Sequence, residues 1–409
     1  MPEIFSVVRR AVVGQLPAGT PFRAVLDDTL LRRSGLHVPG VAWRRDPLGP
    51  RFQTNFVRGQ RFLQISAAMP GADGVFRLAP VAFLHTPTPP KPGPKATAEE
   101  LVQYRLDARD SRLSLRAAQQ VAQLRQSLDQ DAGGKERLLI LAFDGGYTNS
   151  TVLKQIPPHT TCIGRIRKDA SLCFTPDPAL MKTRGRRLRY GAPAPTPEQF
   201  RTDQSEPWQT MTFQHSGIVH QLRYKHRKNM MWRTAGAGQI LQLVIIAPLA
   251  YRLRKGSKLL YRAPGFLICT DPELEPRQVI EAYFQRWDIE VNFRDEKTLL
   301  GVGQAQVRAE HSVESAPALS VAAYGMLLVS AQQAFGNSRD GLLPQPKWAA
   351  ASQGPRTSTQ QMIHQLRAEV WGRGLGIGNF SDFASSLSTT TKPEKCLFPL
   401  ASAVCYANG

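Results

Sequence analysis

The sequence predicts an α/β protein in which a mixed β-sheet, flanked by helices, is interrupted by a mainly β insertion. Two apolar runs with strand character, Phe22–Leu26 and Arg137–Phe143, each lead directly into an aspartate. Between them, strand-like segments alternate with turns that contain Gly and Pro, which is typical of an antiparallel meander. A long basic stretch with further β-like runs then precedes a helical pattern that begins near Pro276.

These patterns divide the 409 residues into five segments. The segments are a short N-terminal piece (1–20), the first part of the core (21–168), the basic insertion (169–270), the second part of the core (271–336), and a linker with a C-terminal helical region (337–409).

Four connecting or helical segments complete this outline. Thr86–Pro94 is a stiff, Pro-rich connector, and Ala98–Gln130 is predicted to form one long helix. Ala316–Phe335 is rich in small apolar residues and is expected to be a buried helix. Asn337–Thr359 reads as a loop or linker, and Gln360–Arg373 as an amphipathic helix.

The charge is strongly positive, with 52 Lys and Arg against 32 Asp and Glu and a net charge of +20. Residues 165–262 hold 19 basic and 5 acidic residues, and their basic clusters are interleaved with aromatic side chains. This distribution favours a polyanionic partner, with nucleic acid as the first candidate. Arg227, Lys228 and Trp232 are the expected contacts within the insertion. The alternative is a basic surface that is merely solvated.

The cysteine and hydropathy patterns indicate the cellular compartment of the protein. The five cysteines are scattered and lack CxxC spacing, which fits a reducing cytoplasm better than a disulfide framework. The N-terminus has no signal-like apolar region, and Pro, Gln, Ser or Gly interrupts the most apolar stretches. We therefore expect a cytoplasmic protein that does not span a membrane. Histidine spacing does not indicate a metal site.

Acidic residues follow the two apolar runs. Asp27 and Asp28 come directly after the first run, and Asp144 comes directly after the second. In open α/β sheets, functional groups gather beyond the carboxyl ends of strands. A turn or helix cap is the alternative role, but it explains one aspartate of the doublet more easily than both.

Glu281–Lys297 is predicted to form one helix that carries a row of polar side chains. Their offsets are 0, 3, 7 and 14, and these place them within roughly 60° on one face: Tyr283, Arg286, Glu290 and Lys297. The adjoining sector is apolar and is expected to be buried: Ile280, Phe284, Trp287 and Val291. The alternative is that Arg286 and Glu290 form an ordinary surface ion pair.

Taken in order, these elements match the ribonuclease-H-like fold, in which the first and fourth strands are adjacent and parallel. Asp28 and Asp144 would then be neighbours, with Glu290 delivered from the flanking helix. Three convergent carboxylates are suitable ligands for Mg²⁺ or Mn²⁺. Two such ions can activate an attacking oxygen and stabilise a leaving oxygen at a phosphodiester.

The chain resembles the DDE transposases of bacterial insertion sequences that carry the signature Tyr, two residues, Arg, three residues, Glu, six residues, Lys. Tyr283, Arg286, Glu290 and Lys297 match all four positions. Asp28-Thr29 and the Asp144-Gly-Gly-Tyr147 stretch resemble the surroundings of the two catalytic aspartates of that group.

The resemblance implies metal-dependent nicking at the element's ends and strand transfer into target DNA. By position, Asp28, Asp144 and Glu290 would be the catalytic residues and would bind Mg²⁺ or Mn²⁺, with two ions expected. Asp27 is the alternative first ligand. The residues expected to contact DNA are Tyr283, Arg286, Lys297, Arg294, Arg227, Lys228 and Trp232. Trp232 is also the candidate to stack on an unpaired base.

The resemblance also implies partners. DNA at the transposon ends and at the target would be the substrate, and a homodimer would form in the active complex. Members of the group usually carry a helical DNA-binding domain before the first catalytic strand, whereas 27 residues precede Asp28. The alternative function is therefore a truncated, non-catalytic remnant that binds DNA or inhibits transposition; a stand-alone nuclease of the same fold is a remoter alternative.

Overall fold

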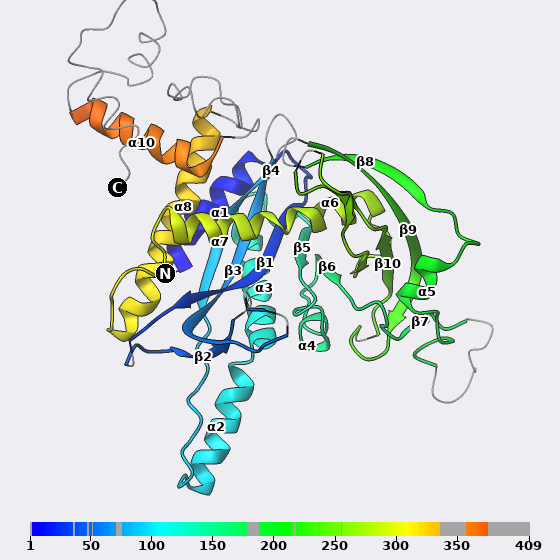
Figure 1. The fold of residues 1–409 in the computed structure, drawn as a ribbon, viewed down its shortest axis with the longest axis horizontal. Coiled ribbons are helices and arrows are strands. Elements are labelled where there is room, and N and C mark those ends of the chain that lie inside the picture. Colours follow the sequence, from blue (N-terminus) through cyan, green and yellow to red (C-terminus); the bar gives the residue numbers. More distant parts are fainter. Residues whose placement is uncertain are drawn as a thin grey trace, which may run out of the picture.

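The computed structural model (Figure 1) describes residues 2–35, 37–46, 49–50, 52–70, 76–177, 188–215, 218–236, 238–254, 256–335 and 357–374. Eleven strands form one large sheet. Six of them build its first half: β1 Phe22–Arg32, β2 Ala42–Arg45, β3 Phe56–Pro70, β4 Phe76–His85, β5 Leu139–Phe143 and β6 Thr160–Arg165.

The strand order in this half is β2-β3-β1-β5-β6, with β4 also paired to β3. β1, β3 and β4 form the expected antiparallel meander, while β5 runs parallel to both β1 and β6. This order is that of the ribonuclease-H-like fold. The predicted class, a large mixed sheet flanked by helices, is confirmed.

The strands of the basic insertion extend the same sheet. β13 pairs with β6, and β10, β9 and β7 follow in order, while β8 pairs with β9. The bounds are β7 Leu172–Phe174, β8 Gln209–His215, β9 Ile218–Trp232, β10 Leu241–Ile246 and β13 Gly265–Cys269. A separate two-stranded sheet consists of β11 Ala250–Tyr251 and β12 Leu260–Tyr261, and a short helix, α5, spans Pro197–Thr202.

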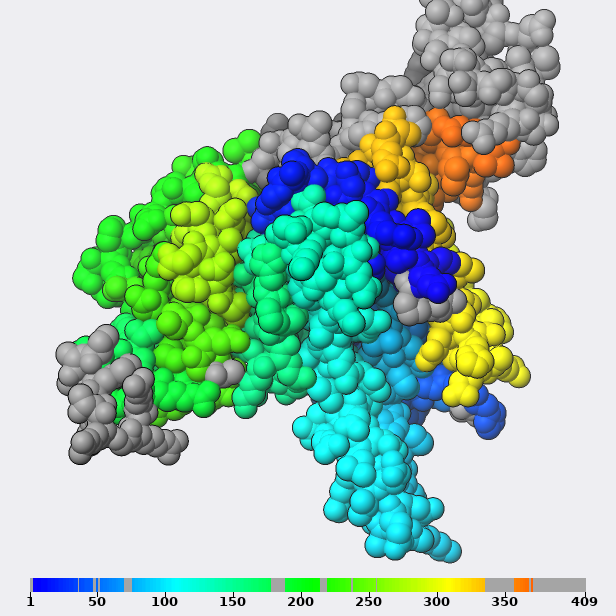
Figure 2. All heavy atoms as spheres, turned by 180° about the vertical axis from the view of Figure 1, so that it is seen from behind, coloured from blue at the N-terminus to red at the C-terminus, as the bar shows by residue number. Residues whose placement is uncertain are grey.

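Helices cover both faces of the sheet: α1 Pro2–Gln15, α3 Leu113–Gln130, α6 Pro276–Gln285, α7 Asp288–Thr298 and α8 Glu310–Phe335. Phe22 and Leu26 of β1 pack in the core cluster that contains α1, α3 and α8, whereas Val25 packs with Ile289 and Phe293 of α7. Figure 1 shows α6 and α7 crossing one face, and Figure 2, seen from behind, shows α1 and α3 on the other. Alternate residues of β1 therefore face two different helical layers.

The segment predicted as one helix, 98–130, forms two helices. α2 spans Ala98–Asp110, and α3 begins at Leu113 after the turn at Ser111 and Arg112. Six residues of α3 are buried, but none of α2 is. Burial thus accounts for the orientation of α3 and leaves α2 projecting from the body (Figures 1 and 2).

A short helix, α4 Ser150–Leu153, follows β5, with Asn149 as its N-cap. α8 is long and apolar enough to cross a membrane, but half of its apolar window is buried and it packs against α1 and β4. α10 spans Thr359–Gly374, close to the predicted C-terminal helix. Most of the predicted linker (336–356) and the tail beyond 374 lie outside the described residues.

Candidate active site

Asp27 and Asp144 are neighbours where two parallel strands lie side by side. Leu26 of β1 is the partner of Phe143 of β5, and an aspartate follows each of these two residues in the sequence. Asp27 belongs to the α7 side of the sheet because it lies two positions after Val25, which packs against α7. The two acidic side chains therefore meet beneath the helix that carries Glu290.

Asp28, the predicted first ligand, is held by other contacts, whereas Asp27 lies on the face of the sheet that α7 covers. Its Oδ1 accepts a hydrogen bond from the Tyr147 hydroxyl at 2.6 Å, and its Oδ2 lies 3.2 Å from Arg61 Nε. Because side chains of a strand alternate, Asp28 shares the face of Leu26, opposite that of Asp27. The open alternative, Asp27, lies beside Asp144 and contacts Arg286, which also reaches Glu290.

The predicted helix 281–297 is interrupted in the middle. α6 ends at Gln285 and α7 begins at Asp288, although Arg286 and Trp287 keep helical backbone angles. Backbone bonds of the i to i−3 type span the break, from Arg286 N to Tyr283 O and from Glu290 N to Trp287 O. This tighter turn changes the direction of the polar row that a continuous helix would present.

Arg286 connects Asp27 and Glu290. Its Nη1 lies 3.3 Å from Asp27 Oδ2, and its Nη2 lies 3.7 Å from Glu290 Oε1. The guanidinium also stands 5.7 Å from the centre of the Tyr283 ring. The surface ion pair considered from the sequence is therefore present, but it is one half of a contact that reaches the β1 carboxylate.

Burial and like charge oppose ionisation of the acids. The pKa of Asp27 is raised to about 7, chiefly by burial and next by the Asp144 carboxylate, while the Asp28 backbone N–H and Arg286 oppose this shift. Burial also raises the pKa of Glu290, and Arg286 works against it. A cation at this position would relieve both effects.

The donor chemistry of Asp27 and Asp144 fits a divalent metal ion. Both are hard oxygen ligands, and one of them is held, largely buried, beside the charge of the other. Glu290 is engaged by Arg286. Among the residues that the structure describes, no group of three or more His, Cys, Asp or Glu side chains is close enough to hold a metal as it stands.

Comparison with known proteins identifies the family. The family model of the DDE superfamily endonucleases matches residues 4–239, more than half of the chain. The chain belongs to this superfamily. Its members are nucleases that act on DNA and generally use divalent metal ions. A search of curated proteins found no match.

The matched part of this DDE endonuclease includes Asp27 and Asp144 and ends before the helix that carries Glu290. α7 is joined to the matched core by a buried contact. Gln64 Nε2 donates to Glu296 Oε1 at 2.9 Å, and Gln64 is the cross-strand partner of Asp27. Gln64 and Glu296 are both buried, so this bond fixes α7 beside the Asp27 carboxylate.

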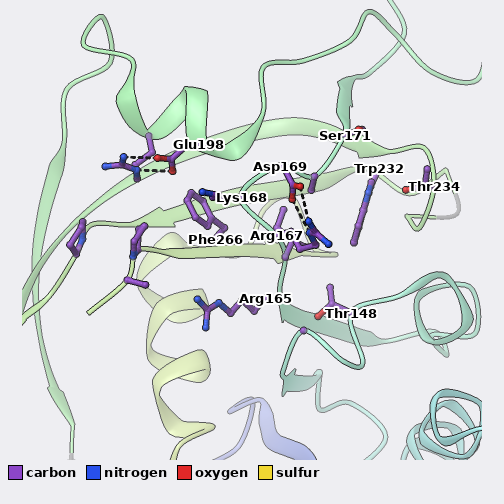
Figure 3. Close-up of a pocket in the computed structure, with 17 residues that line it drawn as sticks. Thr148, Arg165, Arg167, Lys168, Asp169, Ser171, Glu198, Trp232, Thr234 and Phe266 are labelled. Atoms are coloured by element: carbon purple, nitrogen blue, oxygen red, sulfur yellow. Dashed lines mark hydrogen bonds and ion pairs between the residues drawn. The ribbon is translucent and has the colours of Figure 1, made fainter. Parts of the chain in front are cut away.

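A cavity of about 1040 Å³ opens beside the loop that follows Asp144. Figure 3 shows Trp232 and Phe266 in its wall together with basic side chains. The charged lining residues are Arg165, Arg167, Lys168, Arg201, Asp169 and Glu198. Arg167 pairs with Asp169, and Arg201 pairs with Glu198. The DDE endonuclease thus has a basic and aromatic hollow next to its acidic site.

Other residues predicted to contact DNA lie elsewhere. Arg227 pairs with Glu206, and Lys228 pairs with Glu273 at 2.7 Å. Arg294 pairs with its neighbour Asp295. Lys297, at the other end of α7, stands 6.0 Å from the centre of the Phe293 ring, and burial lowers its pKa. Within the described part of the chain, none of these four forms an ion pair or hydrogen bond with Asp27, Asp144 or Glu290.

The sequence reasoning missed one exposed residue beside the site. Trp287 was expected in the buried stripe, but 53% of its surface is exposed. The break between α6 and α7 turns it outward. Because sequence spacing alone predicted a continuous helix, the exposure of Trp287 had no signal in the sequence.

Proposed function

We propose that this DDE endonuclease is an insertion-sequence transposase of the Tyr-Arg-Glu-Lys type, which nicks DNA at the ends of its element and transfers the strands to target DNA. The observation that carries the proposal is the gathering of Asp27, Asp144, Arg286 and Glu290 at one place. They come from two strands and a helix that are far apart in the sequence.

Asp27, Asp144 and Glu290 are the proposed ligands of Mg²⁺ or Mn²⁺, with two ions expected. The bound ions supply Lewis-acid stabilisation of the attacking and leaving oxygens at a phosphodiester. In the free protein, Arg286 provides the positive charge that Asp27 and Glu290 require. Gln64 and Glu296 hold α7 against the sheet, and this keeps Glu290 on the side of the sheet on which Asp27 lies.

Tyr283, Arg286 and Lys297 are proposed to contact the DNA backbone. The Arg286 guanidinium is bidentate and fits a phosphate as well as a carboxylate. Trp287, exposed beside Arg286, is available to stack on a DNA base. Arg227, Lys228 and Arg294 remain proposed contacts that would have to exchange their present acidic partners for phosphate.

The cavity beside Asp144 is proposed to receive an unpaired nucleotide. Trp232 offers aromatic surface to a base, while Arg165 and Lys168 offer positive charge to the adjoining phosphates. The volume of about 1040 Å³ has room for a nucleotide. We further propose that a homodimer forms in the active complex and that the protein works in the cytoplasm, on the bacterial nucleoid.

The experiment is a nicking assay on DNA that carries the sequences flanking the gene, with unrelated DNA of equal length as competitor. Wild type is compared with Glu290→Gln and with Glu136→Gln, a matched change at an exposed glutamate. We expect nicking that depends on Mg²⁺ or Mn²⁺ in wild type and Glu136→Gln, and a loss of at least about 100-fold in Glu290→Gln. Binding without nicking by wild type would favour the DNA-binding remnant.

A further inference from the structure

Helix α2 projects from the body of the protein. None of its 13 residues is buried, and Figures 1 and 2 show it standing clear of the core from both sides. A capping box between Thr97 and Glu100 closes its N-terminus. An isolated helix of this length is only marginally stable in water, so a packing partner would stabilise it.

One face of α2 has coiled-coil spacing. Glu99, Val102, Leu106 and Arg109 follow one another at intervals of 3, 4 and 3 residues, which places them in a single seam about 80° wide. Val102 is 53% exposed and Leu106 is 41% exposed. Two aliphatic side chains in the centre of an exposed seam, with one charge at each end, form a pattern suited to a second helix.

The seam is complementary to itself in the antiparallel direction. If two copies of α2 pair about a twofold axis at the level of Tyr104, Glu99 of one copy stands opposite Arg109 of the other, and Val102 stands opposite Leu106. Each of these pairs occurs twice, as a twofold interface requires. A parallel pair would instead oppose Glu99 to Glu99 and Arg109 to Arg109. Charge therefore selects the antiparallel arrangement.

The remaining contacts of α2 leave this seam available. Arg109 pairs with the adjacent Asp110 at 2.9 Å, but both side chains are more than half exposed, and such pairs exchange partners at little cost. Gln103 and Asp107 lie on the flank beside the seam and hydrogen-bond to each other. The opposite face carries Leu101, Tyr104 and Ala108, of which Tyr104 and Ala108 are half-buried. Val102 and Leu106 are more exposed than these two, so the seam is the face open to a second copy.

We propose that α2 is a self-association helix that pairs antiparallel with α2 of a second copy of this chain. The pairing uses surfaces remote from Asp27, Asp144 and Glu290 and does not rest on the proposed function. Two such helices bury less area than a standard stable interface needs. The association is therefore weak on its own and adds to other contacts when two copies are held on DNA.

The test is sedimentation velocity of the full chain, without DNA or metal, over a range of protein concentrations up to about 200 μM, where an association with a dissociation constant in the micromolar to submillimolar range becomes visible. The variants are Glu99→Arg, Arg109→Glu and the double swap, which restores both opposite-charge pairs. Asp107→Arg is the control, because it makes the same charge change as Glu99→Arg outside the seam.

We expect each single swap to weaken association about fivefold or more, because two attractive pairs become repulsive. The double swap should return to within about twofold of wild type, and Asp107→Arg should match wild type. Far-UV circular dichroism verifies that each variant keeps its helix content. A wild type that stays monomeric, singles that associate as wild type does, or a double swap as weak as the singles would overturn the proposal.

Discussion

Arg286 Nη1 lies 3.3 Å from Asp27 Oδ2, a contact that joins residues 259 positions apart in the chain. The same guanidinium reaches Glu290 at 3.7 Å. Arg286, between α6 and α7, thus pairs with an acid in the middle of the buried strand β1. This contact helps to hold the helix on the sheet and lowers the pKa of both acids against the larger effect of burial.

Replacing Arg286 should change the titration of Asp27. Arg286 lowers the pKa of Asp27 against the effects of burial and Asp144. In Arg286→Gln the pKa of Asp27 should therefore rise above its present value of about 7. Carboxyl ¹³C NMR titration measures this. Arg294→Gln, which removes an arginine paired with Asp295 at the protein surface, is the control and should leave Asp27 unchanged.

In the absence of metal, the free energy of unfolding should decrease as the pH rises, because of Asp27. Its pKa rises from 3.8 in the unfolded chain to about 7 in the folded one, so the folded state holds the proton more tightly. The stabilisation that protonated Asp27 gives the folded state is complete below about pH 4 and is lost as the pH rises through about 7. Asp27→Asn should match wild type at pH 4 and exceed it by roughly 2 kcal/mol or more at pH 8. Urea unfolding in EDTA tests this, and equal differences at both pH values would contradict it.

Glu296 should contribute a second pH dependence of the same sign at higher pH. Burial raises its pKa from 4.5 to about 8, while the Gln64 hydrogen bond and Lys297 oppose the shift and Asp295 adds to it. The stabilisation that protonated Glu296 gives the folded state is complete below about pH 4.5 and is lost as the pH rises through about 8. Glu296→Gln keeps an acceptor for Gln64, so it should become more stable than wild type as pH increases from 5 to 9. Parallel stability curves for the two proteins would show that Glu296 is ionised in the folded state.

Trp232 should contribute to binding of DNA that contains an unpaired base. Stacking of one base on an aromatic side chain is worth about 1–3 kcal/mol, so Trp232→Ala should weaken binding of gapped DNA by about 5- to 150-fold. Fully paired DNA should be affected less. Trp43→Ala is a suitable control because Trp43 is exposed and belongs to β2, away from the cavity. Equal losses on gapped and paired DNA would argue against a nucleotide in the cavity.

Much of the fold follows directly from the sequence. The apolar part of the run RLLILAF forms the central strand β5, Leu139–Phe143, and Asp144 follows it as expected of a functional strand end. The parallel pairing of β1 and β5 was inferred from the order of the elements. These features depend on long patterns that tertiary contacts do not easily override.

The choice between Asp27 and Asp28 could not be made in this way. The run FRAVL is buried on both faces, with Leu26 in one core cluster and Val25 in another. An alternating apolar and polar strand would reveal which face lies inward, whereas a strand buried on both sides does not. The face of the first aspartate is therefore known only once α7 is placed on the sheet.

The interruption between α6 and α7 could not be predicted from the local sequence either. Neither Gly nor Pro stands at positions 285–288, so local propensity predicts one helix. The contact from Arg286 to Asp27 forms at this break. A tertiary ion pair of this kind leaves no periodic signal in the sequence.

The central claim is that Asp27, and not its neighbour Asp28, is the first acid of the active site. The most direct measurement compares metal-dependent nicking by Asp27→Asn and Asp28→Asn on DNA that carries the element's ends. The account predicts a loss of at least about 100-fold for Asp27→Asn. Asp28→Asn should retain a much larger share of the activity, because Asp28 contacts Tyr147 and Arg61 on the other face of the sheet. Full loss in Asp28→Asn together with near wild-type nicking in Asp27→Asn would contradict the account.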